Sequence, residues 1–304
     1  MDYQLIIDNI LKDVEPLRGM GQQATYIPAL AKVNPDQVGL CIETTHNIQY
    51  ACGDADTRFS IQSISKVFAL SMALAIEGEA LWQRMGREPS GNAFNSLVQL
   101  EMEKGRPRNP FINAGAIVVA DVLMSRLPNA EADFLAFVRS LAGNDSIDYN
   151  RGVAESERRQ GYLNAAIVNL LKHHHNIEGD IEQVLRFYFL MCSLEMSCRE
   201  LAHAFLPFAD HHRPFMHSGI SLSMSKVKRI NAVMQTCGFY DEAGDYSYLV
   251  GLPGKSGVGG GIAAVFPGEY SVAVWSPRLN DKGNSLVGMK MLELLTTQTE
   301  LSIF

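Results

Sequence analysis

The stretch "FSIQSISKVF", residues 59–68, places Ser63 and Lys66 three apart at the predicted start of a long apolar helix. Residues i and i+3 of a helix share one face, so the Lys66 amine is expected to reach the Ser63 hydroxyl. Burial of a lysine on a core-facing helix lowers the pKa of its amine toward the neutral form. The pair is therefore predicted to be a nucleophile with its base. The alternative is that Ser63 only caps the helix and Lys66 faces solvent.

A second segment fits the same chemistry. "GKSGVGGG", residues 254–261, lies just before a predicted strand. Lys-Ser/Thr-Gly accompanies Ser-x-x-Lys in β-lactamases and penicillin-binding proteins, where an edge strand offers a backbone N–H to the substrate carbonyl. The segment matches neither GxxxxGK[ST] nor GxGxxG, which argues against a nucleotide-binding loop. A plain glycine-rich turn is the remaining alternative.

The third element of those enzymes, Ser-x-Asn, has two candidates here. "SGN", from Ser90 to Asn92, follows Ser63 closely and lies in a predicted loop, whereas "YLN", from Tyr162 to Asn164, opens a predicted helix. The second is the better spatial candidate.

Length, composition and charge limit the classes of protein to which this chain can belong. The chain has 304 residues, of which 47% are hydrophobic, which is enough for a large core. A formal net charge of -7 without a dense basic run gives no footprint for nucleic acid or an anionic membrane. The start, "MDYQLIIDNILKDVEPL", lacks the basic and unbroken apolar regions of a signal peptide, and no run of about 18 apolar residues occurs. We therefore expect a cytoplasmic protein.

Cysteine and histidine usage gives no metal or disulfide pattern. The five cysteines are scattered without a CxxC pair, which favours reduced thiols. "HHH", His173 to His175, and the later pair His211 and His212 have no i, i+4 histidine pattern with a carboxylate. We expect neither a metal nor another cofactor.

The order of elements predicts an α+β fold. Residues 3–15 read as a helix, "VGLCIETT" and "IQYACGD" as a hairpin, and residues 63 to about 234 as mostly helical. "IAAVFP" and "YSVAVWSP" return to strand character, and "NSLVGMKMLELLTTQ" reads as a closing helix. We expect an antiparallel sheet flanked by N- and C-terminal helices, formed by residues 1–62 and 250–304, an inserted all-helical domain at residues 63–249, and an active site at their interface.

Longer segments carry a family resemblance. "TYIPALAKVNPDQVGL", "EPSGNAFNS", "GRPRNPFINAGAI" and "CGFYDEAGDYSYLVGLPGKSGVGGGI" together resemble the serine-dependent glutaminases of bacteria and mitochondria, over essentially the whole chain. The resemblance implies hydrolysis of L-glutamine to L-glutamate and ammonia on a β-lactamase/DD-peptidase-like fold. It also implies a homodimer or homotetramer.

The resemblance implies roles for individual residues as well. By motif position, Ser63 is the nucleophile, Lys66 its general base, and Tyr240 in "CGFYD" the tyrosine that assists proton transfer near the leaving ammonia. Tyr26 in "TYIPALA" matches a tyrosine of the loop that covers the site, and Val258 in "KSGVGGG" matches a position that gives its backbone N–H. The positions that hold the amino acid part of the substrate are Asn113, Glu157, Asn164 and Tyr188.

Residue types agree with that reading, because a free amino acid needs an anionic partner for its ammonium and neutral donors for its carboxylate. Read alone, Asn113 is equally compatible with an N-cap, Glu157 with a solvated helix face and Tyr188 with a core aromatic. Two other functions stay open. One is a penicillin-interacting serine peptidase or β-lactamase-like hydrolase, and the other is an amino-acid-binding protein without catalysis.

Overall fold

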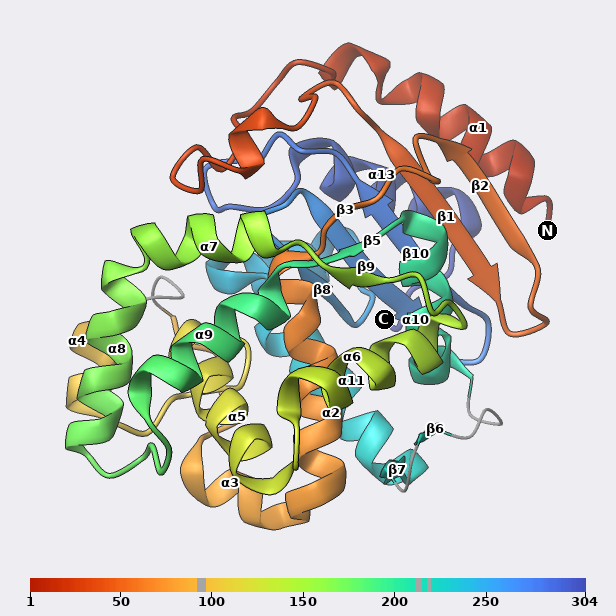
Figure 1. The fold of residues 1–304 in the computed structure, drawn as a ribbon. Coiled ribbons are helices and arrows are strands. Elements are labelled where there is room, and N and C mark those ends of the chain that lie inside the picture. The colour runs from red at the N-terminus through yellow and green to blue at the C-terminus, as the bar shows by residue number, and fades with distance from the viewer. Residues whose placement is uncertain (92–96, 211–214, 218–219) are drawn as a thin grey trace.

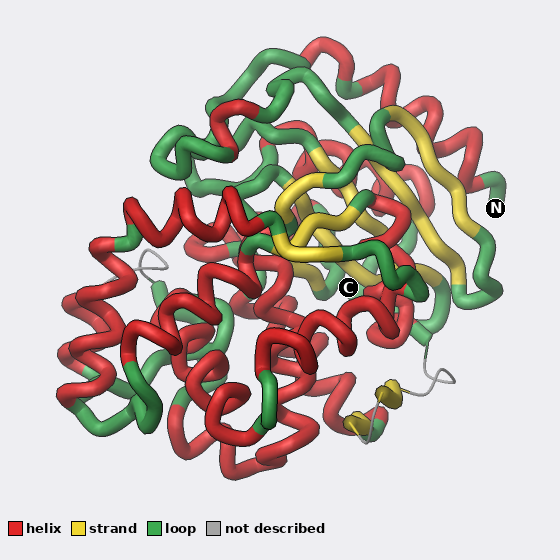
Figure 2. The backbone as a smooth tube through the Cα atoms, viewed as in Figure 1, coloured by secondary structure: helices red, strands yellow, loops and turns green. Residues whose placement is uncertain are grey.

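A five-stranded antiparallel sheet forms the upper layer of the computed structural model (Figures 1 and 2). The structure describes residues 1–91, 97–210, 215–217 and 220–304. The strand order is β2-β1-β10-β9-β8, so the first hairpin and the last three strands form one sheet. These strands are β1 (Gly39–Thr44), β2 (Gln49–Gly53), β8 (Gly254–Ser256), β9 (Gly261–Phe266) and β10 (Tyr270–Trp275).

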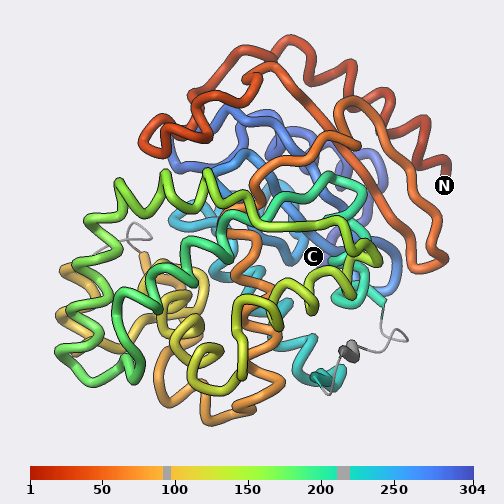
Figure 3. Tube along the Cα trace, viewed as in Figure 1, coloured from red at the N-terminus to blue at the C-terminus, as the bar shows by residue number. Residues whose placement is uncertain are grey.

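Alternation along the strands separates two apolar faces. In β1, Leu40 and Ile42 point toward α1 (Tyr3–Asp13) and α13 (Leu286–Thr299), and they pack with the buried apolar residues of those helices. Cys41, between them, faces the helices on the other side and joins the larger core. Figure 3 shows the first segment of the chain (red) and the last segment (blue) side by side in this layer. The predicted sheet, its hairpins and its two flanking helices are confirmed.

The lower layer is helical, with α2 (Ser65–Glu77) running through its centre (Figures 1 and 2). Every residue of α2 from Ser65 to Leu74 is buried, which is typical of a helix enclosed on all sides. The surrounding helices are α3 (Leu81–Arg84), α4 (Leu97–Met102), α5 (Asn113–Arg126), α6 (Ala130–Ala142), α7 (Arg151–Gln160), α8 (Tyr162–His173), α9 (Ile181–Cys192), α10 (Cys198–Ala209), α11 (Met224–Cys237) and α12 (Ala243–Leu249).

The structure corrects the sequence analysis in this layer. Short strands interrupt the predicted helical block: β4 (Asp148–Tyr149) and β5 (Leu194–Met196) form one small sheet with β3 (Phe59–Ser60), which lies just before the block, and β6 (Phe215–His217) pairs with β7 (Ile220–Leu222). Strands of two or three residues are too short to show a period of two, so the pattern could not reveal them. The β3–β5 pairing matters for the site, because it fixes the backbone immediately before Ser63.

The division into residues 1–62 with 250–304 and residues 63–249 stays a prediction. Cys41 and Ala273 of the sheet share one continuous core with the helices, so the two layers pack intimately. Among the described residues, no helix has both the length and the apolar character needed to span a bilayer.

Candidate active site

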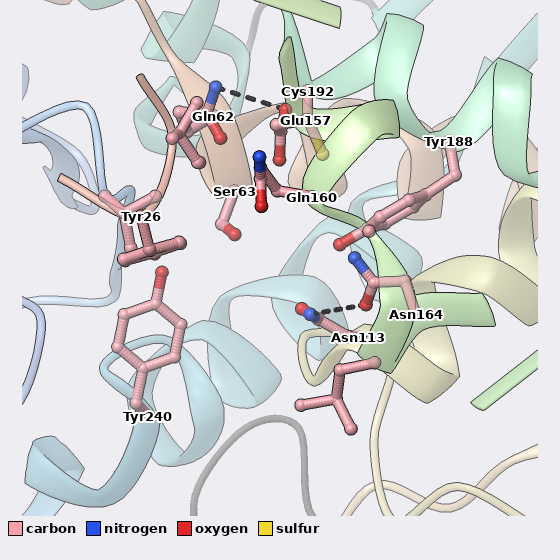
Figure 4. A pocket seen from close by; sticks show the side chains of 14 residues that line it. Tyr26, Gln62, Ser63, Asn113, Glu157, Gln160, Asn164, Tyr188, Cys192 and Tyr240 are labelled. Atoms are coloured by element: carbon pink, nitrogen blue, oxygen red, sulfur yellow. Dashed lines mark hydrogen bonds between the residues drawn. The ribbon is translucent and has the colours of Figure 1, made fainter. Parts of the chain in front are cut away.

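A cavity of about 270 Å³ opens where the two layers meet, and Figure 4 shows its lining. It gathers eight of the nine predicted site residues from distant parts of the chain. The ninth, Lys66, lies buried behind the lining. The lining residues are Tyr26, Ile27, Gln62, Ser63, Asn113, Glu157, Gln160, Gly161, Leu163, Asn164, Tyr188, Cys192, Tyr240 and Val258.

Ser63 lies in the tight 3-10 turn Gln62–Ile64, which ends directly before α2 begins at Ser65. The expectation that Ser63 opens or caps the helix is therefore wrong, since Ile64 holds the N-cap position. The preceding residue, Gln62, has φ 51°, an uncommon conformation for a side chain of its size. This backbone shape is typical of functional sites, where the surrounding structure must hold it. Here β3 and α2 hold it from both sides.

The glycine-rich segment after β8 passes directly beside this turn. A Cβ at Gly257 would lie 2.4 Å from the Ile61 carbonyl oxygen and 3.3 Å from the Ser63 nitrogen. This close approach explains the glycine and brings Val258 into the cavity lining. In the described part of the chain, neither the Ser63 N–H nor the Val258 N–H donates to another backbone group. Both N–H groups are thus available to a bound oxygen.

We expect Gly257→Ala to lower kcat by about 10-fold to 100-fold, because the clash separates the Val258 and Ser63 N–H groups and small misplacements are costly. Gly244→Ala is the matched control, since a Cβ there meets nothing within 4 Å and its φ is not positive. Steady-state kinetics of both variants check this prediction. Equal activity of the two variants would contradict it.

Lys66 is buried, with 1% of its surface exposed, so the alternative of a solvent-facing lysine is wrong. Its Nζ donates to the Asn113 Oδ1 at 2.8 Å and to the Phe111 carbonyl at 3.3 Å. Neither of these two hydrogen bonds goes to Ser63, so the expected contact of the Lys66 amine with the Ser63 hydroxyl stays a prediction. Burial lowers the pKa of the Lys66 amine to about 8, although the Cys192 thiol and the Glu157 carboxylate raise it. The Lys66 amine therefore loses its proton near pH 8, whereas an ordinary lysine does so near pH 10.5.

Tyr240 comes from the 3-10 helix Tyr240–Glu242 and has φ 56°. Its hydroxyl points toward the Ser63 side of the cavity in Figure 4. Burial raises the pKa of Tyr240 to about 12, and hydrogen bonding with Ser63 and Ser256 opposes that rise. The Nζ of Lys255 lies 4.4 Å from the centre of the Tyr240 ring. Tyr240 is thus a protonated donor beside the serine.

The residues predicted to hold the amino acid part of the substrate line the same cavity. The Asn113 Nδ2 donates to the Asn164 Oδ1 at 3.0 Å, so Asn113 bridges Asn164 and Lys66. Asn113 is the first residue of α5 and not its N-cap. Burial raises the pKa of Glu157 to about 7, and the Gln62 hydrogen bond and the Lys66 charge lower it. The Gln62 Nε2 lies 3.4 Å from the Glu157 Oε2 (Figure 4).

Some lining residues were missed from the sequence. Gln62 and Cys192 belong to no motif. Only their nearness to Ser63 and Tyr188 in the chain indicates that they line the cavity. Gln160 and Leu163 lie between Glu157 and Asn164, so their helical neighbourhood was a usable signal. Of the two Ser-x-Asn candidates, the structure brings Asn164 into the cavity, whereas Asn92 lies outside the described residues.

The lysine of the second motif has a supporting place. Lys255, expected just before a strand, lies on the edge strand β8 itself, and its fully buried amine donates to the carbonyls of Gly238 at 2.9 Å and Ser256 at 2.6 Å. Burial holds the pKa of Lys255 well below its usual value. It does not line the cavity.

No group of three or more metal-ligating side chains is gathered within residues 1–91, 97–210, 215–217 and 220–304. Only His173 of the "HHH" run belongs to α8, and the next two residues follow its end. His211 and His212 lie outside the described residues. The five cysteines are free thiols.

Fold and site together define a class. An antiparallel sheet backed by terminal helices, an inserted helical layer, and a serine with a buried lysine at the junction are the features of a β-lactamase-like hydrolase. Comparison with known proteins identifies the family within this class. The family model described as Glutaminase matches residues 21–304. Glutaminases of Christiangramia forsetii and Saccharophagus degradans are each 52% identical, over all of this chain and 100% and 99% of their own lengths.

Solved structures agree. A probable glutaminase, ybaS, superposes with a TM-score of 0.92 at 35% identity, covering 99% of this chain and 97% of its own. A probable glutaminase from Bacillus subtilis, complexed with 6-diazo-5-oxo-L-norleucine, has a TM-score of 0.88 at 30% identity, covering 100% and 98%. The chain belongs to the glutaminase family and is a glutamine amidohydrolase. The predicted family, fold class and enzyme class are confirmed, and the penicillin-interacting alternative is not supported.

Proposed function

We propose that the enzyme hydrolyses L-glutamine to L-glutamate and ammonia through a glutamyl ester on Ser63, with Lys66 as general base. One observation carries the proposal: a single cavity brings Ser63 and Tyr240 together with Glu157 and the two asparagines, Asn113 and Asn164. The cavity can therefore bind the side-chain amide and the α-amino acid group of one substrate at the same time.

The first step is attack on the amide. The Ser63 oxygen bonds to the side-chain carbonyl carbon while its proton passes to the neutral Lys66 amine, directly or through water. The carbonyl oxygen becomes an oxyanion, which the N–H groups of Ser63 and Val258 stabilise. Collapse of this intermediate breaks the C–N bond, and the departing nitrogen takes a proton from Tyr240 or Lys66.

The second step releases glutamate. Water attacks the ester carbonyl and gives a proton to the base, and the C–O bond to Ser63 breaks as the serine regains its proton. All proton transfers use side chains and water, so the steps need no metal or cofactor. Tyr26, at the rim and more than half exposed, is proposed to cover the bound substrate.

The side chains that bind the amino acid part of the substrate determine which substrate is accepted. Glu157 pairs with the α-ammonium group, and the amides of Asn113 and Asn164 and the Tyr188 hydroxyl bind the α-carboxylate. The Bacillus subtilis relative supports this arrangement, since 6-diazo-5-oxo-L-norleucine is an L-amino acid with a carbonyl at the side-chain position of the glutamine amide.

Detection of glutamate from L-glutamine by a glutamate-dehydrogenase-coupled assay tests the proposed function. We expect turnover of L-glutamine with L-asparagine as a poor substrate, because its shorter side chain cannot place the amide at Ser63 while its ammonium meets Glu157. Absence of glutamate formation, or covalent labelling by a penicillin without it, would contradict the proposal.

Glu157→Gln is expected to raise KM for L-glutamine by about 10-fold to 100-fold, because the α-ammonium loses its charged partner. The sign of the pH effect follows from the raised pKa. Glu157 must be ionised to bind the ammonium, so kcat/KM of the wild type rises with pH through about 7. Glu157→Gln is expected to lose this acid limb of the pH profile, that is, the rise of kcat/KM through about pH 7.

The remaining limb, from Lys66, moves to lower pH in that variant, because the Glu157 charge raises the pKa of Lys66. A pH profile of kcat/KM for both proteins checks both effects. Glu155→Gln, on the exposed side of the same helix, is the control and keeps the wild-type KM and profile. An unchanged acid limb in Glu157→Gln would contradict the assignment. A cytoplasmic location and a homodimer or homotetramer complete the proposal, and both stay predictions.

A further inference from the structure

Glu242 ties the turn that carries Tyr240 to the loop at residues 280–284. Its two carboxylate oxygens each accept from the Asn280 Nδ2 at 3.0 Å, and one also accepts from the Asn284 Nδ2 at 2.5 Å. Asn280 closes the loop, since its Oδ1 accepts from the backbone N–H groups of Lys282 and Asn284. Glu242 itself does not line the cavity.

This connection encloses Tyr240 on both sides. The Asn284 Nδ2 lies 3.5 Å from the Phe239 carbonyl, so the loop meets the residue before Tyr240 and, through Glu242, the turn after it. The loop also approaches the ring, because a Cβ at Gly283 would lie 3.9 Å from the Tyr240 Cε2. A non-glycine residue at φ 56° is strained and persists only where its surroundings impose it.

We propose that Glu242 is a positioning residue for Tyr240, holding the left-handed turn so that the hydroxyl stays at Ser63. This inference rests on the proposed role of Tyr240 in proton transfer. The neighbouring ion pair of Lys282 with Asp241, at 2.7 Å, has side chains 52% and 33% exposed. Exposed pairs contribute little, so this pair offers a control on the same turn.

Glu242→Gln preserves size but replaces one acceptor oxygen with an amide nitrogen, which then faces the Asn280 and Asn284 donors. We expect kcat to fall about tenfold with KM within about twofold of the wild type, because the change displaces Tyr240 and not the substrate-binding wall. Adding Asn280→Asp reverses donor and acceptor, since the amide introduced by Glu242→Gln can donate to the new carboxylate. The double variant is expected to recover kcat to within about threefold of the wild type.

The readouts are kcat, KM and Tm for Glu242→Gln, the double variant and the control Lys282→Ala, with Tyr240→Phe measured alongside. A lowered Tm with unchanged kcat in Glu242→Gln would show a purely structural role and overturn the inference, as would failure of the double variant to recover kcat. Loss of activity in Tyr240→Phe beside a fully active Glu242→Gln rejects this inference alone. Full activity of Tyr240→Phe rejects the proposed role of Tyr240 and the inference with it.

Discussion

Ser63→Ala is expected to lower kcat for L-glutamine by at least about 10⁴-fold, because Ser63 is the one serine or threonine among the described residues that line the cavity and loss of a serine nucleophile has effects of this size. Binding is expected to survive, since Glu157 and the asparagines line the cavity independently of the Ser63 hydroxyl. A coupled glutamate assay and calorimetric titration with L-glutamine measure the two effects.

Ser71→Ala is the matched control for this variant. Ser71 is a buried serine of α2, the helix that follows Ser63, and its Oγ donates to the Val67 carbonyl at 2.7 Å, away from the cavity lining. Its loss should cost stability of about 1 kcal/mol and leave kcat unchanged. Activity retained in Ser63→Ala, or lost equally in both variants, would contradict the nucleophile assignment.

Lys66→Met is expected to lower kcat by about 10²-fold to 10⁴-fold, the usual contribution of a general base. The direction in which the rate changes with pH follows from the pKa of Lys66. With its pKa lowered to about 8, Lys66 is mostly protonated below that pH and neutral above it. The wild-type rate should therefore rise with pH through about 8, and residual activity of Lys66→Met should lack this rise. Tyr240, with a pKa of about 12, stays protonated throughout.

The control is Lys226→Met. The Lys226 amine contacts the same helix, donating to the Leu74 carbonyl at 3.0 Å, but it lies outside the cavity lining. It should keep both the rate and the pH profile. A wild-type profile flat from about pH 6 to about pH 10, or one that persists in Lys66→Met, would require a different base.

Much of the site was predictable because its motifs are local. The Ser63 to Lys66 spacing, the edge-strand "KSG" and the long segments around Asn113 and Tyr240 each carry their residue types within a few positions. The sheet was predictable for the same reason, since β1 and β10 are short runs of six residues that contain β-branched or aromatic side chains.

The remaining features depend on tertiary contacts. The left-handed conformations of Gln62 and Tyr240 occur in residues that do not favour them, so composition gives no sign of either. The bond from Lys66 to Asn113 joins positions 47 residues apart, and Glu242 meets Asn280 across 38 residues. A single sequence read for periodicity contains no information on such pairs.

The most direct test of the account is rapid-quench mass spectrometry of the enzyme during turnover of L-glutamine, followed by peptide mapping. We predict a glutamyl group on the peptide that contains Ser63, formed and consumed at rates compatible with kcat and absent in Ser63→Ala. Steady turnover with no covalent glutamyl group at any time, together with an active Ser63→Ala, would contradict it.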